Sequence, residues 1–341
     1  MLPSQMANKL FAVFSLFPCI NLAMRRQNRI FRFIFCGIAF FLTLHYALDR
    51  LTPARTVLKE GIEELDTLCS VIADDCYIVK QIVHSDRTIT RYVQSQKHSA
   101  NGYYTISSVP MKVDSSGNIV VVRETVAFYY IATMIIAPYM TRSLFLDTPG
   151  RVLSIGLGGA TLDMFLYTKQ PQLDITVVEL DETMAEVARK WFGMIESDRR
   201  RTIIADGVRF LETSAKEVVK YDVIALDACN SGDQIFQCPA LPFYDVETMR
   251  NIHDSLSDSG MLVINALSAN VTVIKQTLKQ HFPSCFVSKM PNVNEVVACV
   301  KQSYTGANSK TVDELVSTLF QNTAKKLGLH HTVRTFKFSI I

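Results

Sequence analysis

The sequence lacks the features that would identify several common functions. Its 35 Lys and Arg residues against 32 Asp and Glu leave a net charge of +3, which is too small to predict binding to nucleic acid. It contains no Gly-x-Ser-x-Gly elbow, which argues against a serine hydrolase. Cys229 and Cys238 have neither Cys-x-x-Cys spacing nor a nearby histidine, so no metal site is predicted.

The first 32 residues contain no acid, and they carry Lys9, Arg25, Arg26, Arg29 and Arg32. An apolar segment follows, and residues 30–48 are long enough to cross a bilayer as a helix of about 20 residues. No clear small-residue cleavage site is present, so we expect an uncleaved signal anchor. Residues 10–24 are a weaker candidate for a second span, and a mitochondrial transit sequence is the alternative for the whole region.

The basic cluster predicts that the N-terminal stub stays cytoplasmic and that the chain beyond the anchor is lumenal. Two features agree with this orientation: an even number of cysteines beyond the anchor, and one glycosylation sequon at Asn270. Spacing favours pairing between neighbours in the sequence: Cys69–Cys76, Cys229–Cys238 and Cys285–Cys299. Free, buried cysteines in a cytosolic protein are the alternative.

Four regions are predicted: a stub and anchor over residues 1–50, a lead-in over 51–146, a core domain over 147–305 and a C-terminal region over 306–341. The lead-in is predicted to begin with an amphipathic helix over Pro53–Val71. Antiparallel strands follow over Cys76–His84, Thr88–Ser95, Tyr103–Val109 and Asn118–Arg123. A helix is predicted over Glu124–Met140. The C-terminal region is predicted to hold one helix and then a solvated basic tail.

The core domain opens with V-L-S-I-G-L-G-G-A-T over Val152–Thr161, a pattern typical of a strand, a tight glycine turn and a helix N-terminus. Gly156, Gly158 and Gly159 form this turn. The simplest alternative is that the glycines serve packing alone.

Acids close the next three predicted strands. Glu179 ends the strand that begins at Asp174, Asp206 and Gly207 follow Thr202–Ala205, and Asp227 follows Tyr221–Leu226. Parallel strands present their carboxyl ends at the edge of the sheet where ligands bind. An acid about 20 residues beyond a glycine turn can bind ribose hydroxyls in NAD or in S-adenosylmethionine. Each acid could alternatively cap the helix that follows it.

The segment Val152–Leu267 resembles the class I S-adenosylmethionine-dependent methyltransferases of the spermidine synthase-like branch. The stretches V-E-L-D-E-T-M-A-E-V-A-R-K-W-F-G and I-A-D-G are most similar to the C-terminal domain of the elongation-factor lysine and N-terminal methyltransferases. The resemblance implies an α/β, Rossmann-like, seven-stranded fold, which a hairpin over Cys285–Lys301 would close.

The resemblance also implies roles for the site residues and a cofactor, S-adenosylmethionine. The glycine turn would pass under its methionine part, Glu179 would hold the ribose, Asp206 the adenine amino group, and Asp227 would face the sulfonium and act as the catalytic residue. The implied partner is an amine or protein substrate, and a homodimer is also expected.

Two rival functions remain open. Spermidine synthases have an acid in the glycine turn and a D-S-S-D run, where this chain has Gly159 and D-A-C-N over Asp227–Asn230. Both departures argue against an aminopropyltransferase. A non-catalytic protein of the same fold is the third hypothesis, and the intact glycine turn and acids argue against loss of cofactor binding.

Overall fold

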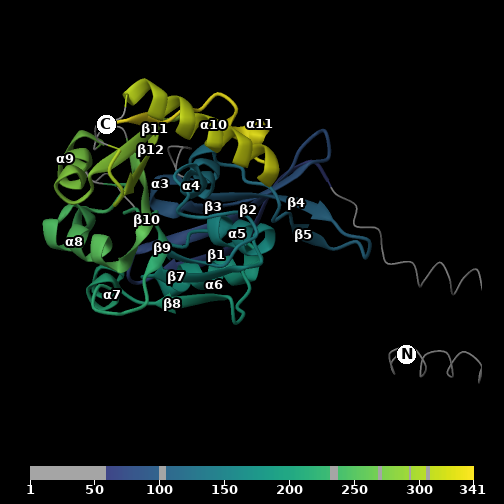
Figure 1. Ribbon diagram of the computed structural model, residues 1–341. Helices are drawn as coiled ribbons and strands as arrows, with labels where there is room; N and C mark the ends of the chain where they lie inside the picture. The colour runs from purple at the N-terminus through teal and green to yellow at the C-terminus, as the bar shows by residue number, and fades with distance from the viewer. Residues whose placement is uncertain (1–58, 100–104, 231–236, 268–270, 292, 305–307) are drawn as a thin grey trace, which may run out of the picture. The chain divides into compact units, whose positions relative to one another are not determined.

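The computed structural model describes residues 59–99, 105–230, 237–267, 271–291, 293–304 and 308–341 (Figure 1). These residues belong to one compact unit, Thr56–Ile341. The predicted membrane anchor and the sequon at Asn270 lie outside them. Among the residues described, no helix has the length and apolar character needed to span a bilayer.

The main sheet contains a parallel core with antiparallel strands on one side. The parallel strands are β6 (Gly150–Ile155), β7 (Leu173–Glu179), β8 (Arg200–Ile204), β9 (Tyr221–Leu226) and β10 (Leu256–Leu267). The antiparallel strands are β11 (Ser284–Lys289), β12 (Asn294–Val300) and β13 (Ser339–Ile340). The strand order is β13-β11-β12-β10-β9-β6-β7-β8. The closing hairpin predicted from the sequence is therefore present as β11 and β12.

Helices pack against both faces of this sheet (Figure 1). Two clusters of buried hydrophobic side chains hold them there. One layer contains α4 (Tyr129–Met140), α5 (Thr161–Lys169), part of α6 (Glu182–Trp191) and α10 (Ser309–Leu327). The other contains α7 (Gly207–Ser214), α8 (Val246–Ser255), α9 (Val271–His281) and the short 3-10 helix η1 (Leu241–Tyr244). The parallel strands β6, β7 and β9 and the second half of β10 are mostly buried because both of their faces are covered, whereas only Arg200 is buried in the edge strand β8.

A separate five-stranded antiparallel sheet precedes the core. Its strands are β1 (Gly61–Ser70), β2 (Asp75–Val83), β3 (Ile89–Ser95), β4 (Thr105–Val113) and β5 (Ile119–Val121), in that order, with a single helical turn α3 (Gln96–Ser99) after β3. Apolar side chains of β2, β3 and β4 pack against α6. This packing attaches the accessory sheet to the nucleotide-binding core.

The predicted helix over Pro53–Val71 is wrong for the residues described, because Gly61–Ser70 form β1. Leu65 and Leu68 do pack against the same hydrophobic cluster as Trp191, but they do so from a strand and not from a helix. The strand is fixed by pairing with β2, which sets Cys69 opposite Cys76. Tertiary pairing thus overrides a helical apolar spacing.

The C-terminal tail is not the solvated segment that was predicted. After α10 and the short helix α11 (His330–Val333), the chain returns to the main sheet as β13, an eighth strand beyond the seven expected. Phe336 and Phe338 are buried, and the Phe338 ring meets that of Phe320 at 5.3 Å between centroids. The alternating phenylalanines rather than the neighbouring basic residues determine how the tail packs.

All six cysteines of the described part form disulfides, in the pairing expected from their spacing. Cys69 is bonded to Cys76, Cys229 to Cys238 and Cys285 to Cys299. The first and last pairs lie directly opposite one another on neighbouring antiparallel strands.

Candidate functional site

The glycine turn after β6 packs against the end of β9. Gly156 has φ +95°, and a side chain there would lie 2.8 Å from the carbonyl carbon of Asp227, so only glycine allows this approach. Gly158 has φ +50°, and no atom of the described residues lies within 4 Å of the space that its side chain would take. The turn is therefore closed on the side of the sheet and open on the other side.

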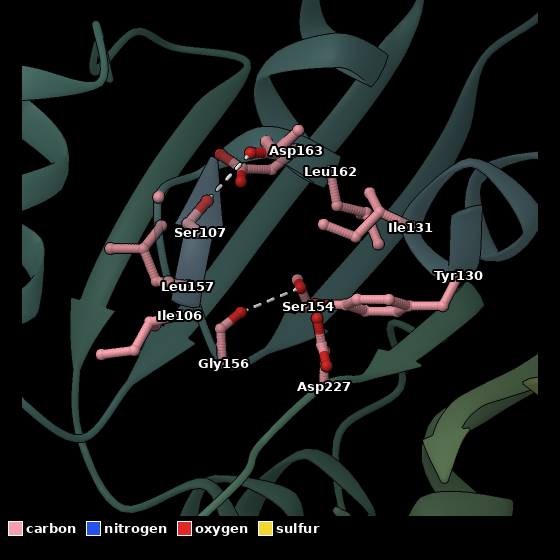
Figure 2. Close-up of a pocket in the computed structure, with 13 residues that line it drawn as sticks. Ile106, Ser107, Tyr130, Ile131, Ser154, Gly156, Leu157, Leu162, Asp163 and Asp227 are labelled. Atoms are coloured by element: carbon pink, nitrogen blue, oxygen red, sulfur yellow. Dashed lines mark hydrogen bonds between the residues drawn. The ribbon is translucent and has the colours of Figure 1, made fainter. Parts of the chain in front are cut away.

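A small, partly open hollow lies beside this turn (Figure 2). Its walls come from β4, the start of α4, the glycine turn, the start of α5 and the end of β9. The lining residues are Ile106, Ser107, Tyr130, Ile131, Ser154, Gly156, Leu157, Gly158, Gly159, Thr161, Leu162, Asp163 and Asp227. Four of the residues predicted for the site, the three glycines and Asp227, thus line one hollow.

Glu179 stands at the end of β7, next to the turn. The Leu157 N–H donates to its Oε2 at 2.9 Å, and the Asp181 N–H donates to its Oε1 at 2.8 Å. Burial raises the pKa of Glu179, and these two N–H groups oppose the rise by stabilising the carboxylate. Each carboxylate oxygen can accept a further hydrogen bond, so the group is oriented and still able to bind hydroxyls.

The accessory sheet reaches Glu179 through Asp181. The Tyr77 hydroxyl of β2 donates to Asp181 Oδ2 at 2.6 Å, while Asp181 Oδ1 accepts from the Thr183 N–H at 2.9 Å and caps α6. Burial and the adjacent carboxylate raise the pKa of Tyr77 far above its usual value, so this tyrosine stays a donor. The backbone that holds Glu179 is therefore anchored from two layers of the molecule.

Asp227 follows β9 on the opposite side of the turn. The Asn265 Nδ2 donates to its Oδ1 at 2.8 Å, and the Tyr130 hydroxyl is also hydrogen-bonded to it. Tyr130 reaches from α4 toward Ser154 and Asp227 (Figure 2). Burial raises the pKa of Asp227 to about 6, although both hydrogen bonds favour its ionised form. At pH 7 it is mostly ionised and is a stronger base than an ordinary aspartate.

Asp206 and Gly207 do not line the hollow. Asp206 Oδ1 accepts from the Val208 N–H at 2.8 Å and the Arg209 N–H at 3.3 Å, which is the geometry of a helix cap. A side chain on Gly207 would meet Ile155 at 2.7 Å. The capping alternative is therefore real for Asp206, whose position at the end of β8 still lies at the ligand-binding edge of the sheet.

A disulfide closes the loop after Asp227. The Cys229–Cys238 bond joins the two ends of this loop, and the Ala240 N–H donates to the Ala228 carbonyl at 2.8 Å. Residues 231–236 of this loop lie outside the described part. Together the disulfide and the hydrogen bond fix where this loop leaves and rejoins the edge of the sheet.

Ser107 of β4 covers the third glycine of the turn. A side chain on Gly159 would lie 2.7 Å from the Ser107 Cβ and 3.0 Å from the Phe192 ring. The Ser107 hydroxyl also lies 3.3 Å from that of Thr161, within hydrogen-bonding distance. An acidic side chain at residue 159 therefore has no room, because the accessory sheet already fills that space.

Several site residues were missed by sequence reasoning. Ser107 and Tyr130 come from elements outside the motif, and no local signal marks them. Asn265 carried a signal, since it is a polar residue inside the apolar run over Gly260–Leu267. Asp163 was also missed; its carboxylate forms a fully buried ion pair with Arg200, at 2.7 Å.

The geometry favours a ligand with hydroxyls at Glu179 and a positive charge near Asp227. In the part of the chain that the structure describes, no group of His, Cys, Asp or Glu could hold a metal ion. Open space above Gly158, an oriented carboxylate on one side and a basic aspartate on the other suit a nucleoside-containing cation.

Comparisons with known proteins agree with this geometry. Mouse "eEF1A lysine and N-terminal methyltransferase" is 34% identical over 162 residues, 46% of this chain and 23% of the relative. The "Polyamine aminopropyltransferase" of Vibrio vulnificus is 32% identical over 127 residues, 37% of this chain and 41% of the relative. The chain thus spans about a quarter of the length of the mouse protein and less than half of the bacterial one.

Among solved structures, human Methyltransferase-like protein 13 in complex with SAH is similar, with a TM-score of 0.52 and 26% identity. The similarity covers 61% of this chain and 94% of that one. The spermine/spermidine synthase domain matches residues 128–314, more than half of the 341 residues. The chain belongs to the spermine/spermidine synthase domain family, in the branch with the class I methyltransferase fold.

Proposed function

We propose that this chain is an S-adenosylmethionine-dependent methyltransferase that acts on an amine, with a protein lysine or N-terminus as the substrate class. The observation that carries the proposal is the Glu179 carboxylate, oriented by two backbone N–H groups beside a glycine turn. The names of the relatives with lysine and N-terminal methyltransferase activity support the choice of an amine acceptor.

The residues present fit the cofactor. Glu179 would accept hydrogen bonds from the ribose hydroxyls, and the open space above Gly158 would admit the main body of the ligand. Leu180, which is 51% exposed directly after Glu179, would offer apolar surface to the adenine, as would Ile204 at 45%. The bound cofactor supplies an electrophilic methyl group on a positively charged sulfur.

Asp227 would serve the acceptor. Its carboxylate attracts an amine, holds it in line and accepts the proton that the amine must lose. A pKa of about 6 keeps Asp227 ionised at pH 7 while making it more basic than a solvated aspartate. Tyr130 and Asn265 donate to this carboxylate and fix its direction.

An aminopropyltransferase is the second candidate, because the family includes such enzymes and a bacterial relative is named as one. Two observations oppose it. Asn230 stands where spermidine synthases have the last acid of their D-S-S-D run, and an amide cannot take a proton from a polyamine. Ser107 fills the space that an acid at residue 159 would need.

The test is calorimetry of the full chain with S-adenosylmethionine and with its decarboxylated form, followed by an assay for methylthioadenosine with putrescine. The methyltransferase proposal expects tighter binding of the intact cofactor and no putrescine-dependent product. Release of methylthioadenosine would establish the aminopropyltransferase instead. Binding of neither compound would support the non-catalytic alternative.

We further propose that residues 30–48 anchor the protein and that its catalytic part is lumenal. The three disulfides support this, because such bonds persist in oxidising compartments. Protease protection in sealed microsomes and glycosylation at Asn270 are expected. A protease-accessible, unglycosylated domain with free thiols would reverse the orientation. Dimerisation stays a prediction, to be tested by the mass in solution.

A further inference from the structure

A series of two side-chain hydrogen bonds runs from Asn294 on β12 through Asn265 on β10 to Asp227. Asn294 of β12 donates from Nδ2 to Asn265 Oδ1 at 2.8 Å. Asn265 of β10 in turn donates from Nδ2 to Asp227 Oδ1 at 2.8 Å. Asn265 is only 2% exposed, so its amide is removed from water and depends on these partners.

The chemistry of an amide determines the donor-to-acceptor direction of these two hydrogen bonds. An amide has one accepting end and one donating end, so the partner of the first end decides where the second one points. Asn294 donates to the oxygen of Asn265, which directs the Asn265 NH₂ toward Asp227. The reversed amide would set an oxygen against the carboxylate and an NH₂ against the NH₂ of Asn294, and both contacts are repulsive.

Among the residues that the structure describes, few charged groups face Asp227. From α4 the facing titratable group is Tyr130, and from α5 it is Asp163, whose charge is matched by Arg200. Glu179 ends β7, two strands from β9. On β10 and β12 the neighbours are the two neutral amides, while Glu295 alternates to the other face of β12, where it lies 3.8 Å from Lys275.

We propose that Asn294 is a positioning residue that acts through Asn265 to keep Asp227 ionised at neutral pH. The inference rests on the proposed function, because an ionised Asp227 attracts both the positively charged sulfur and the incoming amine. Asn294 lies on the closing hairpin, far in sequence from the motif, and it does not itself line the hollow.

The experiment compares S-adenosylmethionine with S-adenosylhomocysteine, since only the first carries the positive sulfur. Calorimetry of the full chain from pH 5 to pH 8 gives the ratio of the two affinities, and its midpoint reports the ionisation of Asp227. A carboxyl NMR titration of Asp227, assigned with Asp227→Asn, gives the same midpoint without any ligand. Asn251→Ala on α8 is the matched control, because this asparagine takes no part in the two hydrogen bonds that lead to Asp227.

The expected midpoint is near pH 6 in the wild type and in Asn251→Ala. Asn294→Ala should raise it by roughly half to one pH unit, and Asn265→Leu by about one to two, as expected for a lost hydrogen bond to a charge. Asn294→Asp should raise it more than Asn294→Ala, because a carboxylate there draws the Asn265 NH₂ away and turns its oxygen toward Asp227.

A double variant separates a role through Asn265 from packing and from an added charge. Asn294→Ala should shift the midpoint no further once Asn265→Leu is present, whereas a direct effect of residue 294 would add its own shift. A packing role also predicts that the isosteric Asp is milder than Ala, and an added shift, that milder effect or unmoved midpoints would overturn the inference. Unchanged affinity for S-adenosylhomocysteine at pH 8 verifies the fold of each variant, and Asn265→Asp replaces a variant that fails to fold. If the wild type binds neither compound, the proposed function fails. The NMR midpoints alone then test whether Asn294 acts on Asp227 through Asn265.

Discussion

Asp227 should weaken the fold that it serves. Its pKa rises from an ordinary 3.8 to about 6 on folding, a difference of about 2 pKa units. At 1.36 kcal/mol per unit, ionised Asp227 costs up to about 3 kcal/mol of folding free energy, and partial contact with solvent reduces this to roughly 1–3 kcal/mol. The isosteric change Asp227→Asn removes the charge and leaves an oxygen for the NH₂ of Asn265. We expect a more stable, inactive protein.

The pH dependence distinguishes this cause from others. Below the unfolded pKa of 3.8 both states are protonated and the charge costs nothing; the cost grows as pH rises toward 6 and is complete above it. Differential scanning calorimetry of both proteins from pH 4 to pH 8 should show a melting temperature about 2–8 °C higher for Asp227→Asn at pH 7. This difference in melting temperature should shrink toward pH 4. An equal gain at every pH, or a loss at pH 7, would refute the reasoning.

Three further predictions use the same structure. Glu179→Ala removes two charge-assisted hydrogen bonds to the ribose, so the affinity for S-adenosylmethionine should fall roughly ten- to hundredfold by calorimetry; unchanged affinity in a folded variant would contradict the ribose assignment. Arg200→Met leaves Asp163 buried without its partner and should cost about 3–5 kcal/mol in chemical denaturation, whereas an exposed pair would cost under about 1 kcal/mol. Reduction of the Cys229–Cys238 disulfide frees the loop beside Asp227, so a reductant should lower the rate of methyl transfer. As a control, the double Ser variant should show the same loss of rate without reductant. A fully active double variant would exclude the loop as the cause.

The core of the fold could be predicted from the sequence because β6, β7 and β9 are short, mostly apolar runs that end at a glycine or an acid. The strand Tyr221–Leu226, for example, has the predicted bounds. Buried parallel strands require continuous apolar residues, so the pattern is strong wherever both faces are covered. The same argument explains why the closing hairpin was visible.

The errors occurred where partners distant in the sequence decide the outcome. Leu58, Ile62, Leu65 and Leu68 have the spacing of a helix, yet residues 61–70 pair with β2 and a disulfide joins the two strands. In the tail, basic residues suggested a solvated surface, whereas Phe336 and Phe338 anchor it to the sheet. Neither partner can be identified from local periodicity.

The site was predictable only where it follows the motif. The glycines, Glu179 and Asp227 follow a spacing that the backbone imposes, and their roles stay predictions. The residues that complete the hollow come from elsewhere: Ser107 lies on the accessory sheet and Tyr130 on α4. Asn265 and Asn294 meet only because β10 and β12 are paired.

The wall that Ser107 gives to the hollow means that the family boundaries do not delimit a working protein. The matched segment begins at residue 128 and ends at 314, so it leaves out Ser107 on one side and Phe338 on the other. A chain trimmed to that segment would keep the glycine turn and both acids, but it would expose Gly159 to water and leave β11 with a bare edge. We therefore expect the accessory sheet to belong to the smallest segment that binds the cofactor. N-terminal truncations should lose binding before they reach residue 105.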